Sequence, residues 1–118
     1  PDFVCLAAAN TYGRGADRIY AGRNQLDGAS LDRYVVVPVD YDTALEFKLG
    51  EGNPGWVEYV HNVRRAVEKT ATKHVVGTRA IITGCKGLAA GLSRDRVEDA
   101  TIWKGLSPDI IRKVKAEM

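Results

Sequence analysis

The sequence contains few of the residues that mark secreted or metal-binding proteins. Only two cysteines occur among 118 residues, and Cys5 and Cys85 lie far apart inside apolar stretches. Such cysteines are typical of small buried hydrophobic side chains rather than of a disulfide or a metal pair, so we expect a reducing, cytoplasmic setting. The two histidines, His61 and His74, are 13 residues apart, which is not a metal-ligand spacing. We therefore expect no metal site in this chain.

Long apolar runs and a strong charge of either sign are also missing. No apolar run approaches the roughly 18 residues that a membrane-crossing helix needs, and no basic and then apolar leader begins the sequence. We expect a soluble protein without membrane contact. The formal net charge of +2 does not by itself indicate a dedicated nucleic-acid-binding protein. A hydrophobic content of 45% is enough for the core of one modest domain, or of a fragment of a larger protein.

Two short apolar runs lie in the first third of the sequence. FVCLAAA at residues 3–9 and YVVVPV at residues 34–39 have the pattern of strands covered on both faces. Pro38 should mark the end or edge of the second strand, because it has no backbone N–H to donate. Since two such strands are not a fold in themselves, their neighbours must come from elsewhere.

After Pro38 the pattern changes to helices. Asp40 or Asp42 is a candidate N-cap for DYDTALEFKL, which places Leu45 and Leu49 on one helix face. The following patterns predict an amphipathic helix with Val57, Val60, Val63 and Val67 on one face, an apolar helix whose glycines permit close packing, a helix capped by Ser93, and a last helix opened by Ser107 and Pro108. The sequence thus predicts a mostly α-helical α/β fragment, with part of an α/β core at residues 1–39 and a bundle of about five helices at residues 40–118.

Asn10 is a candidate site residue because it directly follows the first apolar run. Ligand-facing groups in open α/β sheets lie at the carboxyl ends of the strands. An asparagine there can donate and accept hydrogen bonds at once, which suits the orientation of a water molecule against a phosphate. The alternative interpretation is that Asn10 caps the turn that follows it.

The stretch AAANTYGRGADRIYAGRNQLDGASLDRYVVVPVDYD resembles the second half of an AAA+ ATPase core, in the MoxR and dynein-related branch that includes the cobalt-chelatase ATPase subunit. In that branch a strand ends in the sensor 1 asparagine, a glycine-rich stretch follows, and L-D-R-F or L-D-R-Y precedes the next strand. GTRAIITGCKGLAAGL is similar to the lid helix, in which the family writes S-x-R-A. The three motifs occur in the family's order and cover nearly the whole chain.

This resemblance implies a fold and a set of roles. Residues 1–39 would hold the last strands of a P-loop NTPase core, and residues 40–118 a helical lid domain. Asn10 would be sensor 1, Arg33 the arginine finger that acts across a subunit boundary, and Arg79 the sensor 2 arginine that contacts the nucleotide. The complete protein would bind ATP and Mg²⁺, form a homo-oligomeric ring, and remodel a protein, metal-insertion or nucleic-acid complex.

Simpler interpretations exist for each arginine taken alone. Arg33 could pair with a neighbouring carboxylate such as Asp32, and Arg79 could be a charge on a helix surface. As an ordered set with Asn10, the functional interpretation is the better one. Arg14, Arg18 and Arg23 occupy a glycine-punctuated segment that could line the pore of a ring, contact the next subunit, or simply form a solvated loop.

The sequence lacks two elements of ATP chemistry. It has no G-x-x-x-x-G-K-[ST] motif, and the GCKG at residues 84–87 lacks both the spacing and the preceding strand. No apolar strand ends in paired acids that could hold Mg²⁺. We therefore expect that the chain alone does not hydrolyse ATP, and that it is the C-terminal portion of an AAA+ protein, either excised or truncated.

The alternative function is a stand-alone helical module that binds protein or nucleic acid without ATP chemistry. Basic residues gather in NVRRAVEKTATK and IIRKVKAEM, and a basic helix face can bind phosphates. More often such a face is only solvated, which the interspersed Glu68 and Glu117 favour. Trp56 and Trp103 are expected in the core or between helices, with a subunit interface as the lesser option.

Overall fold

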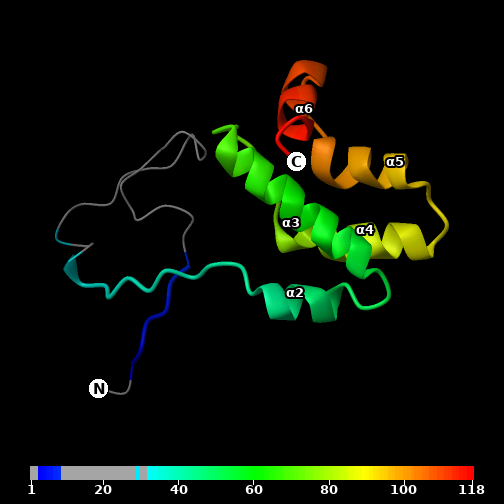
Figure 1. Cartoon of the computed structure of the whole chain (residues 1–118). Helices are drawn as coiled ribbons and strands as arrows, with labels where there is room; N and C mark the ends of the chain where they lie inside the picture. Colours follow the sequence, from blue (N-terminus) through cyan, green and yellow to red (C-terminus); the bar gives the residue numbers. More distant parts are fainter. Residues whose placement is uncertain (1–2, 9–28, 30–31) are drawn as a thin grey trace. The chain divides into compact units, whose positions relative to one another are not determined.

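The computed structural model describes residues 3–8, 29 and 32–118. The chain divides into two units, residues 1–39 and residues 40–118, and each is described by itself. The second unit is helical throughout, and its helices follow one another with short connections (Figure 1). They are α2 (Thr43–Leu49), α3 (Pro54–Lys69), α4 (Thr78–Ala89), α5 (Arg94–Glu98), the π-helix η1 (Asp99–Trp103) and α6 (Pro108–Lys115).

Capping residues fix where three of these helices begin. The Asp42 side chain accepts a hydrogen bond from the backbone N–H of Leu45, so Asp42 rather than Asp40 is the N-cap of α2. Asn53 caps α3 in the same way, and Ser107 caps α6. Both α3 and α6 have proline in the first turn, where its missing N–H leaves no helical bond unmade. The predicted start of α6 at Ser107 and Pro108 is confirmed.

The core of this unit is built around α3. The four valines predicted to share one face, Val57, Val60, Val63 and Val67, are all buried, which confirms the amphipathic helix. Helix α3 packs against α2, α4 and α6, and α4 also packs against α5 and η1. Trp56 and Trp103 belong to this core, as predicted. The remaining buried apolar side chains are Ala66, Val76, Ala80, Ile81, Val97, Ile102 and Val114.

Two glycines allow helices to approach closely, and one of them, Gly84, lies in the apolar helix for which such packing was predicted. A Cβ atom on Gly84 would overlap the indole of Trp56, and one on Gly50 would overlap a methyl group of Val57. The Trp56 indole lies across α4 and donates a hydrogen bond of 3.1 Å to the carbonyl of Ala80. The absence of a side chain at Gly84 therefore makes room for the largest residue of the core.

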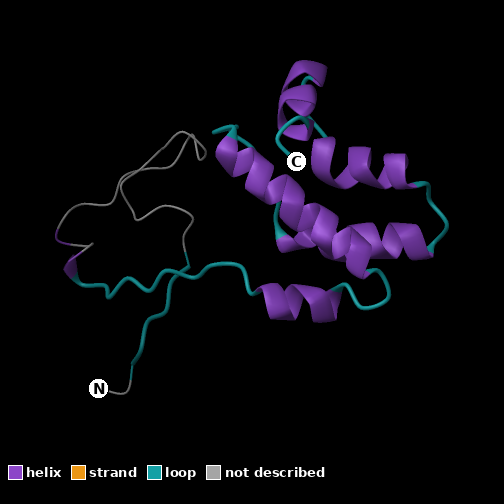
Figure 2. Cartoon of the chain, viewed as in Figure 1, coloured by secondary structure: helices purple, strands orange, loops and turns teal. Residues whose placement is uncertain are grey.

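The α/β fold class predicted from the sequence is wrong for the residues that the structure describes. Residues 3–8 and 35–40 have no regular secondary structure, and no β-strand is present in the described part of the chain (Figure 2). Phe3, Leu6, Val35 and Val39 are each more than 80% exposed. A strand forms only when another segment pairs with its backbone, and none of the described residues provides that pairing.

The described helices are also short. None of them combines the length and the apolar character that a membrane span requires.

Candidate functional site

The first turn of α4 carries Arg79 and begins without a side-chain cap. Its N-cap is Gly77, which has no side chain that could accept a hydrogen bond from the free N–H groups of the turn. Arg79 is the second residue of the helix, and its side chain is exposed. The resemblance placed Arg79 at the start of a helix, and α4 does begin there.

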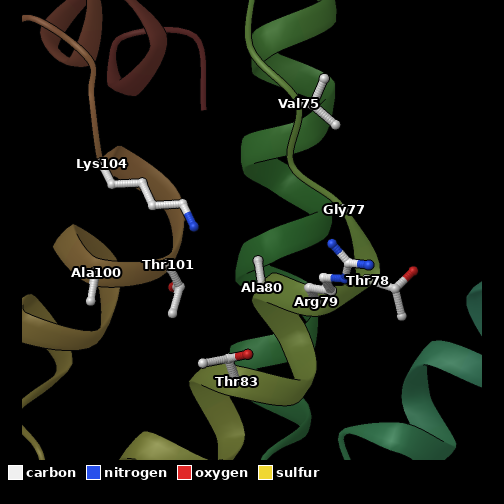
Figure 3. A pocket seen from close by; sticks show the side chains of 9 residues that line it. All are labelled: Val75, Gly77, Thr78, Arg79, Ala80, Thr83, Ala100, Thr101 and Lys104. Atoms are coloured by element: carbon white, nitrogen blue, oxygen red, sulfur yellow. The ribbon is translucent and has the colours of Figure 1, made fainter. Parts of the chain in front are cut away.

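A hollow of about 490 Å³ lies between the start of α4 and the segment around η1. Figure 3 shows Lys104 extending from the end of η1 toward α4, whereas Thr78 projects away on the other side of that helix. The residues that line the hollow are Val75, Gly77, Thr78, Arg79, Ala80, Thr83, Ala100, Thr101 and Lys104.

The charged side chains that line this hollow are all cationic. Arg79 and Lys104 are cationic, three threonines are neutral and polar, and no lining residue carries a carboxylate. Within the described part of the chain, neither Arg79 nor Lys104 is joined to a carboxylate by an ion pair. Two unpaired cations suit an anion, because a phosphate oxygen accepts hydrogen bonds from both of them. The Thr78 and Thr101 hydroxyls already donate to Glu46 and to the carbonyl of Val97, so they are not free to donate to an anion.

A buried carboxylate lies behind the first turn of α4. Glu46 of α2 is 1% exposed, and both of its oxygens are hydrogen-bonded. The guanidinium of Arg64 donates to both oxygens at 2.9 and 3.0 Å, and the Thr78 hydroxyl donates to one of them at 2.7 Å. His61 Nε2 lies 2.8 Å from the other oxygen. Glu46 thus joins α2, α3 and the start of α4.

These contacts keep Glu46 ionised. Burial by itself would raise the pKa of Glu46, but hydrogen bonds from Arg64, Thr78 and His61, together with the charge of Arg64, lower the pKa from 4.5 to about 2. The same arginine donates from Nε to the carbonyl of Val76 at 3.0 Å and lies 3.5 Å above the ring centre of Tyr41. Arg64 is therefore held on several sides at once.

A second buried carboxylate supports the other side of the hollow. Glu98 accepts hydrogen bonds from the hydroxyl of Tyr59 at 2.7 Å and from the indole of Trp103 at 3.1 Å. Arg94 and Lys115 lie 3.0 and 3.5 Å from its oxygens. Burial would raise the pKa of Glu98, but these hydrogen bonds lower it, while burial and the Glu98 carboxylate raise the pKa of Tyr59. Glu98 thereby fixes Trp103, the residue directly before Lys104.

The structure describes two of the three site residues that the resemblance implies. Asn10 lies outside the described residues, as do Arg14, Arg18 and Arg23. Arg33 is described and exposed, and it belongs to the other unit of the chain. Within the described residues, Asp32 and Arg33 are not joined by an ion pair. Arg79 lines the hollow beside α4.

The histidines and cysteines do not form a metal site. Within residues 3–8, 29 and 32–118, no group of three histidine, cysteine or acidic side chains is close enough to hold an ion. His61 contacts Glu46, and His74 Nε2 lies 2.6 Å from the carbonyl oxygen of Ile102. Cys85 is half-buried, and burial raises the pKa of its thiol, which makes it a weaker nucleophile.

Two important residues were missed by sequence reasoning. Glu46 lies between Leu45 and Phe47 in the sequence. The Glu46 side chain is buried, whereas both apolar neighbours are 40% or more exposed. Gly50 lies four residues later on the same face, where a Cβ atom would overlap a methyl group of Val57. Lys104 was missed because its place beside Arg79 depends on how η1 packs against α4, which no local pattern reveals.

Comparison with protein-family models, with curated proteins and with solved structures found no match to this chain.

Proposed function

We propose that this chain is the C-terminal portion of an AAA+ ATPase of the MoxR and dynein-related branch. The complete protein would couple ATP hydrolysis to the remodelling of a protein, metal-insertion or nucleic-acid complex. Residues 40–118 would act as the lid that contacts the nucleotide. The observation that carries this proposal is the hollow beside α4, in which Arg79 and Lys104 stand without any carboxylate among the lining residues.

Arg79 has the chemistry that this role requires. A guanidinium donates two parallel hydrogen bonds to a phosphate and stays charged at every physiological pH. Lys104 adds a second positive charge from the opposite side of the hollow. A triphosphate carries several negative charges, so two cations attract it more strongly than they attract a singly charged ion.

Arg33 is proposed as the arginine finger for a nucleotide bound in a neighbouring subunit. Its exposed side chain can be reached by another molecule. An arginine supplied across a subunit boundary stabilises the charge that develops on the transferred phosphoryl group. The described residues contain no metal-binding group, so this proposal assigns Mg²⁺ to ligands in other parts of the complete protein.

The first experiment tests the hollow on the chain itself. Inorganic tripolyphosphate is titrated into the ¹⁵N-labelled chain, and the amide shifts of residues 78–83 and 100–104 are followed by NMR. We expect saturable shifts there, and about tenfold weaker binding for Arg79→Ala, because a charge-assisted bidentate contact is lost.

Lys86→Ala is the matched control, since Lys86 lies on the same helix, is exposed and does not line the hollow. It removes the same charge and should leave the titration within about twofold of the original. Equal weakening by Lys86→Ala and Arg79→Ala would show unspecific charge attraction and would contradict the proposed nucleotide contact.

The second experiment tests Arg33 in the complete ATPase. We expect Arg33→Ala to lower Mg²⁺-dependent ATP turnover by about 10³-fold or more while leaving ATP affinity nearly unchanged, because a finger acts on the transition state. The Lys48→Ala variant, which removes an exposed charge on α2, is the control. Turnover that does not respond to Arg33→Ala would contradict its role as the finger.

A helical interaction module without ATP chemistry is the second candidate. One observation favours it: α2 exposes Leu45, Phe47 and Leu49, which are 40–49% accessible. Apolar side chains gathered on one helix are typical of a binding surface. A chain that gives no localised response to tripolyphosphate, and a complete protein that does not hydrolyse ATP, would favour this function over the first.

A further inference from the structure

We infer that Glu46 is a positioning residue for Arg79, and that it acts through the hydroxyl of Thr78. The inference rests on the proposed function, because it assigns a task to a residue that does not line the hollow. Glu46 belongs to α2, whereas Arg79 belongs to α4, so the connection between them is a tertiary contact rather than a local one.

The connection consists of one short hydrogen bond. The Thr78 hydroxyl donates to Glu46 Oε1 at 2.7 Å, and Thr78 directly precedes Arg79 in the first turn of α4. Figure 3 shows the Thr78 side chain on the side of α4 away from Lys104. Fixing Thr78 to α2 fixes the rotation of the first turn about the helix axis. Because consecutive helical residues are about 100° apart, this rotation decides where Arg79 points.

No local group replaces this contact. Most helix starts are held by a serine, threonine, aspartate or asparagine side chain at the N-cap, but α4 has Gly77 there and makes no side-chain cap. The first turn of α4 therefore depends on Glu46 for an anchor that α2, α3 and α6 obtain from their own N-cap side chains.

The same carboxylate holds the segment that leads into α4. Glu46 fixes the guanidinium of Arg64 by two hydrogen bonds, and Arg64 Nε donates to the carbonyl of Val76 at 3.0 Å. Val76 lies two residues before Thr78. Glu46 thus fixes the chain both at Thr78 and, through Arg64, just before the helix begins.

The contacts made by Glu46 and Arg64 extend to the first residues of the helical unit. The Arg64 guanidinium lies 3.5 Å from the ring centre of Tyr41, the second residue of the unit that starts at Asp40. Cation–π contacts of this kind hold a guanidinium in one orientation. Glu46 is therefore the common partner that links the entry to the unit, helix α3 and the turn that carries Arg79.

The experiment uses Thr78→Val, which keeps the branched shape of the side chain and removes only the hydroxyl. We expect about fivefold weaker tripolyphosphate binding in the NMR titration, and faster hydrogen exchange of the Ala80 and Ile81 amides without ligand. Thr78→Ser restores the hydroxyl and should recover most of the affinity. Charge and lining cations are the same in all three proteins, and the hydroxyl that is removed donates to Glu46 rather than to a ligand. A change in affinity therefore reports the position of Arg79.

Thr70→Val is the matched control for a lost threonine hydroxyl. The Thr70 hydroxyl bonds to the carbonyl of Ala66 at the end of α3 and does not line the hollow. This variant should lose similar stability, measured by urea unfolding, and should bind tripolyphosphate within about twofold of the original chain. Equal weakening by Thr70→Val and Thr78→Val would overturn the positioning role.

The outcomes separate this inference from the proposed function. If Arg79→Ala weakens binding and Thr78→Val does not, the nucleotide contact stands and the positioning role of Glu46 is overturned. If Arg79→Ala itself leaves binding unchanged, the proposed function fails, and the inference fails with it. If both variants weaken binding and Thr78→Ser restores it, the inference is supported.

Discussion

Glu46 and Glu98 show how single acidic residues organise an otherwise apolar core. Each carboxylate is nearly inaccessible to solvent and accepts hydrogen bonds from more than one helix or segment. In the described part of the chain, every buried side-chain nitrogen or oxygen has a hydrogen-bond partner. A buried ion pair gives little net stability over an apolar pair of the same volume, but removal of one partner leaves an uncompensated charge.

That asymmetry gives a prediction for Glu46→Gln. The variant keeps the shape of the side chain but leaves the partly buried guanidinium of Arg64 without its counter-charge, so we expect the free energy of unfolding to fall by about 3 kcal/mol. Urea unfolding followed by circular dichroism measures the change. Glu58→Gln, on the exposed side of α3, is the control and should change stability by less than about 0.5 kcal/mol. A Glu46→Gln chain as stable as the original would contradict the central place of this carboxylate.

At the residue scale, the sequence revealed the exposed residues of the site better than the buried ones. Arg79 could be proposed because it begins a recognisable helix. Glu46 could not, because a glutamate between two apolar residues gives no sign of which side of the helix will be buried. The burial of Glu46 depends on Arg64 and Thr78, which lie 18 and 32 residues away and supply the hydrogen-bond partners that a buried charge requires.

Helix α4 illustrates packing at the scale of an element. Its buried face is interrupted at Gly84, and the Trp56 indole occupies the space where a side chain would stand. The indole N–H is also bonded to the backbone of the same helix. Helices α3 and α4 are therefore held together by the Trp56 indole of α3, which packs directly against the backbone of α4 at Gly84.

We predict that Gly84→Ala destabilises the chain despite the higher helix propensity of alanine. The added methyl group would overlap the indole, and relief of that overlap would displace Trp56, at an expected loss of about 2 kcal/mol or more. Thermal unfolding measures it. Gly55→Ala is the control, since a Cβ at Gly55 meets nothing within 4 Å and should leave stability unchanged or raise it slightly. A Gly84→Ala chain that unfolds no earlier than the Gly55→Ala chain would contradict the tight fit.

Element by element, the helices were predictable and the strands were not. Helix α3 follows from valines at helical spacing, and α6 from Ser107 and Pro108, because amphipathic spacing and caps are local properties of the sequence. The apolar runs at residues 3–9 and 34–39 have strand-like composition, but a strand also needs a partner segment. Composition alone does not provide one.

At the scale of the whole molecule, the helical unit should respond to acid through its buried carboxylates. The pKa of Glu46 is lowered from 4.5 to about 2, so its contribution to stability is complete above the unfolded value and is lost as pH falls from about 5 to 2. The loss amounts to about 3 kcal/mol, and Glu98, whose pKa is also lowered, adds to it in the same direction.

Urea unfolding at a series of pH values between 6 and 2 measures this dependence. Glu46→Gln should remove a large part of the slope below pH 5, because glutamine does not titrate. A slope that is the same in both proteins would show that other carboxylates cause the acid sensitivity.

The π-helix at Asp99–Trp103 has a consequence for how this chain tolerates changes in length. A π-helical turn closes its hydrogen bonds over five residues instead of four, so it accommodates one residue more than an α-helical turn does. Deletion of a single residue there would let the turn close as an ordinary α-helical turn, so the residues that follow would keep nearly the same orientation about the helix axis. Lys104 would then stay beside the hollow although the chain is one residue shorter. In an ordinary α-helix the same deletion would rotate the residues that follow by about 100°, so η1 is the part of this segment that best tolerates a shorter chain.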